Sequence, residues 1–61
     1  MFVEFVTVVD NDLISFNKNH IVAFYPDNED PRFTHIEVVN DDEGFLVNDS
    51  YEEVKRKLKY S

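Results

Sequence analysis

The chain contains no cysteine, and this absence constrains its fold more than any other feature of the sequence. A domain of 61 residues buries only roughly 60% of the surface that its unfolded chain exposes. Neither disulfide bonds nor a thiolate-bound metal ion can add stability, so side-chain packing must supply it. Six phenylalanines and three tyrosines provide large apolar surfaces for such a core. We expect a single domain over residues 1–61, located in a reducing cytoplasm.

Runs of β-branched and aromatic residues, separated by polar turns, predict about five strands. These runs cover residues 2–9, 13–17, 20–25, 33–40 and 45–47. The first run is almost continuously apolar, which predicts a strand with both faces at least partly covered. It is too short to span a membrane. Asn11 and Gly44, the only glycine, stand in polar turns where a left-handed backbone would close a hairpin.

A helix is predicted to start after Ser50. Ser50 and Glu53 have the spacing of a capping box, in which the hydroxyl accepts from the Glu53 amide and the carboxylate accepts from the Ser50 amide. Apolar residues three and four positions apart lie on one face of a helix. Such a stripe is predicted for Tyr51, Val54 and Leu58. The expected fold class is α+β, a small curled antiparallel sheet of about five strands with one C-terminal helix packed on it.

The predicted helix also holds four of the six basic side chains of the chain. These are Lys55, Arg56, Lys57 and Lys59. Cations are favourable near the C-terminal end of a helix, where the helix dipole is negative. This placement favours a well-arranged helix terminus over a dedicated anion-binding site.

Residues that could carry catalysis or bind a metal ion are scarce. The single glycine excludes a glycine-rich phosphate loop, which needs two or three glycines at fixed spacing. His20 and His35 stand on separate predicted strands, so a zinc site would need carboxylates from elsewhere. A calcium loop starting at Asp27 would place Arg32 where glycine is required. We expect no catalytic residues, no metal ion and no cofactor.

Charge is distributed unevenly along the chain. Residues 1–50 carry eleven acidic and two basic groups, net −9, whereas residues 51–61 carry two acidic and four basic groups, net +2. A negative body repels phosphate backbones, so the basic surface of another protein is the expected partner. We interpret the chain as a small acidic, non-catalytic protein-interaction module that binds a host or partner protein. The partner-binding residues are predicted in two acidic loops: Asp27, Glu29, Asp30, Arg32, Phe33, Asp41, Asp42 and Glu43.

Two further functions are weighed against this one. A nucleic-acid mimic would inhibit a DNA-binding enzyme, with carboxylates imitating phosphates if the two acidic loops lie at the same end of the fold. A nucleic-acid binder would use the terminal helix, but its cations face the field of the negative body. We therefore expect no direct nucleic acid and no membrane among the partners. A homodimer through an open sheet edge is a further expectation.

One combination of segments spans the chain from Val3 to Leu58: Ile14 and Phe16, Ile21 and Phe24 before Pro26, THIEVVND, Gly44, FLV and SYEEVKRKL. Together these segments resemble a known family, the small flagellar and swarming-motility proteins of the FlbD type. The resemblance implies the same fold without catalytic residues, and a motility accessory is one role that fits. The closing strand and helix also resemble the end of LytTR-type DNA-binding domains. In length and strand order the chain resembles the CsrA-type RNA-binding regulators. Those rely on arginines in the first strand and before the helix, where this chain has MFVEFV and VNDS.

Overall fold

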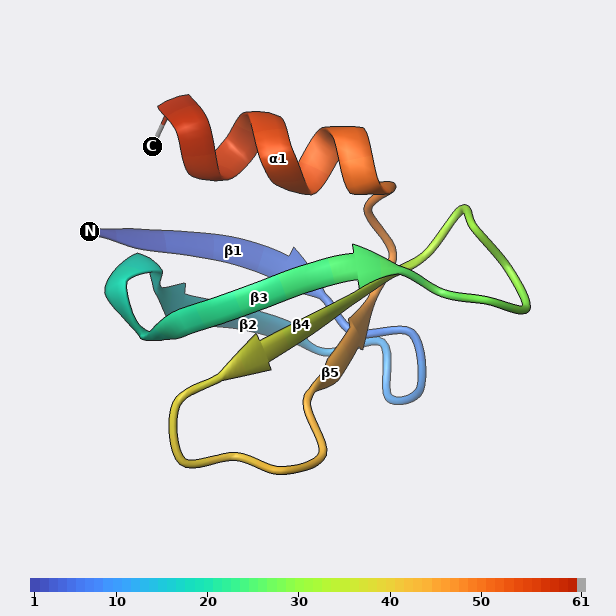
Figure 1. Ribbon diagram of the computed structural model, residues 1–61, viewed down its shortest axis with the longest axis horizontal. Coiled ribbons are helices and arrows are strands. Elements are labelled where there is room, and N and C mark those ends of the chain that lie inside the picture. The colour runs from blue at the N-terminus through green and yellow to red at the C-terminus, as the bar shows by residue number, and fades with distance from the viewer. Residues whose placement is uncertain (61) are drawn as a thin grey trace.

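Five β-strands and one α-helix form the part of the chain, residues 1–60, that the computed structural model describes (Figure 1). In chain order they are β1 (Phe2–Val6), β2 (Leu13–Asn17), the short 3-10 helix η1 (Lys18–His20), β3 (Ile21–Pro26), β4 (Thr34–Val38), β5 (Phe45–Val47) and α1 (Tyr51–Tyr60). The α+β class is therefore confirmed. Within residues 1–60, no helix is long and apolar enough to cross a membrane.

The strands form two antiparallel sheets, not the single sheet that the sequence predicts. β1 pairs with β2, and the second sheet has the order β3-β4-β5. The two sheets meet at a single bridge between Thr7 and Val47. Hydrogen bonds of 2.9 Å from the Val8 amide to the Leu46 carbonyl and from the Asn48 amide to the Val6 carbonyl flank this bridge. The strands thus follow one another in the curled order β2-β1-β5-β4-β3, which leaves β2 and β3 outermost.

β1 differs most from its prediction, because it ends at Val6 and is covered on one face only. Val3 and Phe5 are buried, whereas Phe2 is 65% exposed. The strand ends where Thr7 closes a turn with Asp12: the Thr7 amide donates to the Asp12 carbonyl at 2.8 Å and the Thr7 hydroxyl accepts from the Asp12 amide at 3.1 Å. The prediction of a strand over residues 2–9 with both faces covered is therefore wrong.

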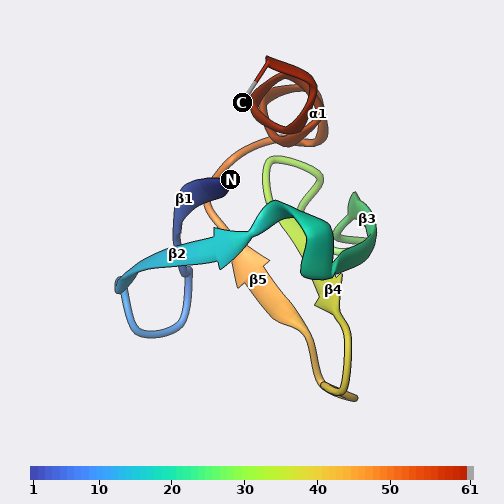
Figure 2. The same ribbon diagram turned by 90° about the vertical axis from the view of Figure 1, so that its left-hand side faces the viewer.

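The core lies between the two sheets and beneath α1, which Figure 2 shows end-on above the strands. Its buried apolar members are Val3, Phe5, Phe16, Ile36, Val47 and Val54. Phe16 contacts the rings of Phe5 and Phe45 edge to face, with ring centroids 5.8 and 5.0 Å apart. Such pairs add to the stability that burial supplies. The aromatic side chains therefore join the sheets in place of covalent cross-links.

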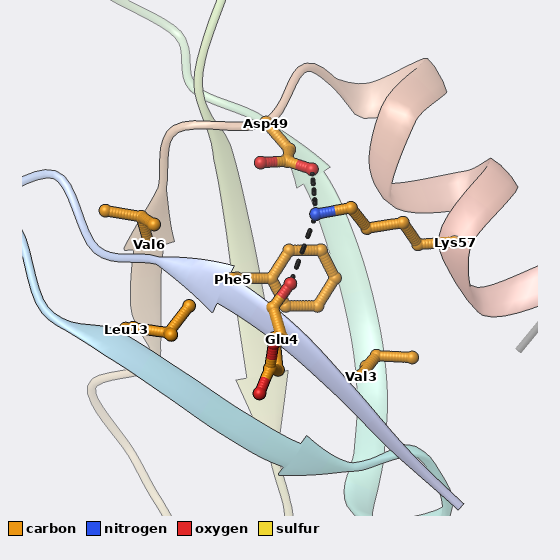
Figure 3. A pocket seen from close by; sticks show the side chains of 7 residues that line it. All are labelled: Val3, Glu4, Phe5, Val6, Leu13, Asp49 and Lys57. Atoms are coloured by element: carbon orange, nitrogen blue, oxygen red, sulfur yellow. Dashed lines mark hydrogen bonds and ion pairs between the residues drawn. The ribbon is translucent and has the colours of Figure 1, made fainter.

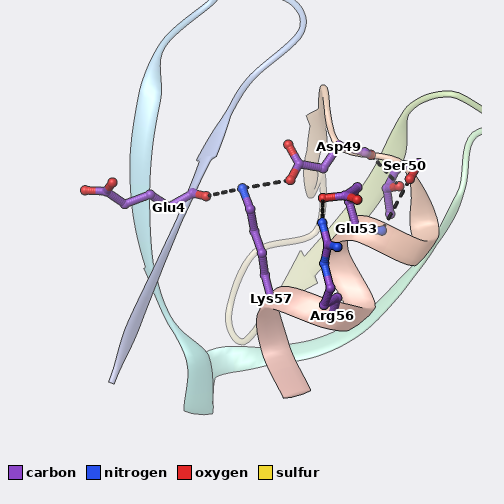
Figure 4. Close-up of polar contacts among 7 residues, drawn as sticks. Glu4, Asp49, Ser50, Glu53, Arg56 and Lys57 are labelled. Carbon is purple, nitrogen blue, oxygen red and sulfur yellow. Dashed lines mark hydrogen bonds and ion pairs between the residues drawn. The ribbon is translucent and has the colours of Figure 1, made fainter. Parts of the chain in front are cut away.

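The turn and cap predictions are largely confirmed. Asn11 and Gly44 have φ values of 56° and 75°, in the left-handed region. The Ser50 hydroxyl accepts from the Glu53 amide at 3.3 Å, which caps α1 as predicted. The second half of the predicted capping box differs. The Glu53 carboxylate accepts a hydrogen bond from Arg56, on the next turn of the helix, in place of one from the Ser50 amide (Figure 4). Arg56 lies three residues after Glu53, so the two side chains are neighbours on the helix surface.

Candidate functional site

The acidic loop between β3 and β4 satisfies its own polar groups. Asp27 accepts hydrogen bonds from His35 Nε2 at 2.6 Å and from the Asp30 amide at 2.9 Å. Asp30 pairs with Arg32 through two bonds, from Nε at 3.0 Å and from a terminal guanidinium nitrogen at 2.8 Å. The Phe33 amide donates to the Asp30 carbonyl at 3.0 Å. These contacts hold the loop in one shape and use most of its predicted partner-binding groups internally.

The pKa values follow from these contacts. The hydrogen bond from His35, and then the one from the Asp30 amide, holds the pKa of Asp27 below its ordinary value. The Arg32 guanidinium lowers the pKa of Asp30 in the same way. Tyr25 stacks on the His35 ring at 5.2 Å and donates to Glu37 at 2.9 Å, and this bond raises the pKa of the Tyr25 phenol. Both carboxylates of the loop thus have hydrogen-bond partners of their own, and the Arg32 guanidinium also compensates the charge of Asp30.

The second acidic stretch, Asp41 to Glu43, lies in the turn between β4 and β5. Because these hairpins follow one another along the sheet, the two acidic loops lie at opposite ends of β4 (Figure 1). The Asp41 carboxylate turns inward and accepts from the amides of Glu43 at 3.0 Å and Gly44 at 3.4 Å. Gly44 is required here, since a Cβ atom would stand 3.0 Å from the Ile36 carbonyl oxygen. The predicted site residues therefore fall into two separate groups.

A cleft of about 260 Å³ lies between this second turn and the turn after β1. Asp10 and Glu43 stand at its rim, and its apolar lining includes Ile14, Phe45 and Leu46. Val9 also lines it and is 82% exposed. None of the residues that line this cleft is basic. Within residues 1–60, no ion pair engages Asp10, Asp42 or Glu43. The cleft thus combines apolar surface with uncompensated negative charge.

Sequence reasoning missed Val9 and Asp10 as site residues. The sequence predicts Val9 at the end of a strand with both faces covered and Asp10 in a polar turn. A strand that ends at Val6 exposes Val9, and the bridge from Thr7 to Val47 brings Asp10 toward the β4–β5 turn. Only the alternation within residues 2–6 hints at this, because Glu4 interrupts the apolar run on the outer face.

One of the basic side chains of α1, Lys57, contacts the first strand. The Lys57 amine contacts the carboxylate of Asp49, just before the helix, at 2.7 Å and the Glu4 carbonyl on β1 at 3.1 Å (Figure 3). It also stands 4.8 Å from the centre of the Phe5 ring. These contacts fill the polar end of a cleft of about 380 Å³ between β1 and α1. Lys57 therefore ties the helix to the first strand, a role that the predicted helix-terminus placement of the basic run does not include.

No group of three or more histidine or acidic side chains within residues 1–60 is arranged to hold a metal ion. Comparison of the chain with protein-family models, curated proteins and solved structures gives no match. Its class is thus defined by the fold itself, an α+β arrangement of two small antiparallel sheets under one C-terminal helix.

Proposed function

We propose that this protein is a small non-catalytic interaction module that binds a basic segment of a partner protein in the cleft between the β1–β2 and β4–β5 turns. The observation that carries this proposal is the placement of Asp10 and Glu43 on the rim of an apolar cleft that has no basic lining residue. A lysine- or arginine-flanked aliphatic side chain matches this surface in both polarity and charge.

The position of the charge favours this site over the first acidic loop. Asp27 and Asp30 already accept hydrogen bonds from His35 and Arg32, so a basic partner would compete with those contacts there. Asp42 and Glu43 are exposed and have no such partner within residues 1–60. Uncompensated surface carboxylates attract a basic partner at long range and speed association.

The mimic of nucleic acid is less well supported by this geometry. It needs the carboxylates of both acidic loops on one face at phosphate spacing. The loops lie at opposite ends of β4, and the carboxylates of Asp27, Asp30 and Asp41 bind groups of their own loops or neighbouring strand. A protein partner needs only the one cleft.

The test is an NMR titration with the peptide acetyl-KLKIKLK-amide, in which lysine alternates with leucine or isoleucine. We expect saturable changes of the amide signals around Val9, Asp10 and Phe45. The variant Asp10→Asn/Glu43→Gln should bind on the order of tenfold more weakly, since two contacts between opposite charges are lost. Added salt should weaken binding to the natural chain in the same direction.

The matched control removes the same charge elsewhere. Glu29 and Glu52 are exposed and lie outside the cleft. Glu29→Gln/Glu52→Gln should leave the dissociation constant within about twofold, because only the general field changes. Equal weakening by both double variants, or amide changes spread over the whole chain, would show that net charge and not the cleft attracts the peptide.

A further inference from the structure

The outer surface of α1 holds a hollow of about 260 Å³. Its lining comes from the helix alone: Glu52, Lys55, Arg56, Lys59 and Tyr60. Arg56 pairs with Glu53. Among the residues that the structure describes, no ion pair engages Lys55 or Lys59, and both are exposed. They lie four residues apart on one face of the helix, so the hollow presents two cations beside the one carboxylate of Glu52.

Tyr60 adds apolar surface at the end of this hollow. Its side chain is 75% exposed, and the Lys59 amine stands 5.5 Å from the centre of its ring. A tyrosine ring supplies a large contact area at low cost in conformational entropy. The outer face of α1 therefore combines an apolar ring with cations, which is the chemistry that the acidic cleft between the β1–β2 and β4–β5 turns lacks.

The acidic cleft and the helix face lie on different sides of the molecule. Figures 1 and 2 both show α1 on one side of the strands and the β1–β2 and β4–β5 turns toward the other. The helix face of one chain therefore cannot fill the cleft of the same chain, but that of a second copy can. A contact between two different surfaces is heterologous, so each copy keeps a free cleft or a free helix face for another copy.

We propose that the outer face of α1 of one copy docks in the acidic cleft of a second copy. This inference rests on the proposed function, because it names the occupant of the same cleft. The Tyr60 ring enters the apolar lining, and the amines of Lys55 and Lys59 lie beside the two carboxylates at the rim. Copies thus associate head to tail, which differs from a dimer through a sheet edge, where the same strand of both copies would pair.

The net charge of the chain opposes this association at long range. Each copy carries −7, so two copies repel one another until the complementary surfaces are close. At physiological ionic strength, exposed charges more than about 8 Å apart are largely screened, whereas charges in contact are screened less. The attraction is therefore local. Neutralising the two acidic residues of the cleft lowers the net repulsion and should nevertheless abolish association, an effect opposite in sign to that of net charge.

The experiment measures the weight-average mass of the full chain by sedimentation equilibrium, over about a hundredfold range of concentration at physiological salt. The mass of the natural chain should rise above that of one chain as the concentration increases. Asp10→Asn/Glu43→Gln and Lys55→Gln/Lys59→Gln should each stay at the mass of one chain. All four side chains are exposed, so both variants should fold like the natural chain.

A mixture of equal amounts of the two variants is the decisive sample. The cleft variant keeps the helix face and the helix variant keeps the cleft, so one contact can form between them. We expect the mixture to associate again and to stop at two chains. Its mean net charge equals that of the natural chain, which separates the specific contact from the general field.

Three outcomes would overturn this inference. A natural chain that stays at the mass of one chain, while acetyl-KLKIKLK-amide still binds the cleft, would show that the occupant is another protein and would leave the proposed function standing. Association that persists in each variant alone would show pairing at another surface, such as a sheet edge. A mixture that does not associate would show that the two surfaces do not meet. A natural chain that stays at the mass of one chain and does not bind the peptide would refute both proposals.

Discussion

Replacing Lys57 with methionine tests whether the helix is held on β1 by the contacts of one amine. Methionine keeps an unbranched apolar stem, so the change removes the charge and its contacts while retaining most of the packing. The amine contacts the Asp49 carboxylate, the Glu4 carbonyl and the Phe5 ring. Two of these contacts, with Glu4 and Phe5, join α1 to β1, and the third holds the segment just before the helix.

The expected cost follows from these contacts. A hydrogen bond to a backbone carbonyl contributes about 0.5–1.5 kcal/mol, a solvated ion pair about 0–1 kcal/mol, and an exposed cation–π contact about 0.5–1 kcal/mol. Because the Lys57 side chain is 41% exposed, solvent screening keeps the ion-pair and cation–π contributions at the low end of these ranges. We expect Lys57→Met to lower the free energy of unfolding by about 1–2 kcal/mol. A chain of 61 residues has only about 3–9 kcal/mol in total.

Thermal and urea unfolding, followed by far-ultraviolet circular dichroism, measure this loss. A change of about 1 kcal/mol shifts the Tm of a domain of this size by about 4–8 °C. Lys55→Met is the matched control on the exposed side of the same helix, and it should stay within about 0.5 kcal/mol of the natural chain. A double-mutant cycle with Asp49→Asn isolates the ion pair. Equal stability of Lys57→Met and Lys55→Met would refute the reasoning and return Lys57 to the solvated helix surface.

Two further predictions concern the helix start and the first acidic loop. Ser50→Ala should destabilise the protein by about 0.5–2 kcal/mol, because the Glu53 amide loses its acceptor; an unchanged urea midpoint would contradict the cap. The pKa values of Asp27 and Asp30 are lower in the folded than in the unfolded chain. Their contacts therefore stabilise the fold fully at a pH above the ordinary pKa of aspartate. This stabilisation is lost as the pH falls through the pKa values of the folded chain. His35→Leu, which removes the donor, should raise the pKa of Asp27 and leave that of Asp30 low, because Arg32 holds the latter. Carboxyl NMR titration measures both pKa values, and an unmoved Asp27 would show that His35 is not its main partner.

Local patterns in the sequence determine much of the fold. The bounds of β2 and β5 agree with their predicted runs, and α1 starts after Ser50 as the cap and the apolar stripe indicate. The left-handed turns at Asn11 and Gly44 follow from residue type alone. These features depend on residues that are close in sequence, so periodicity and turn chemistry are enough to find them.

The candidate sites required the tertiary structure. Asp10 and Glu43 line one cleft only because Thr7 bridges to Val47, and Lys57 binds the Glu4 carbonyl from the other end of the chain. The hydrogen bond from His35 likewise engages the Asp27 carboxylate, which the sequence presents as free. A row of acidic residues does not reveal which carboxylates already have hydrogen-bond partners, since that depends on how distant strands are brought together. Charge composition predicts a basic partner, and the pairing of distant strands places Asp10 and Glu43 beside one cleft.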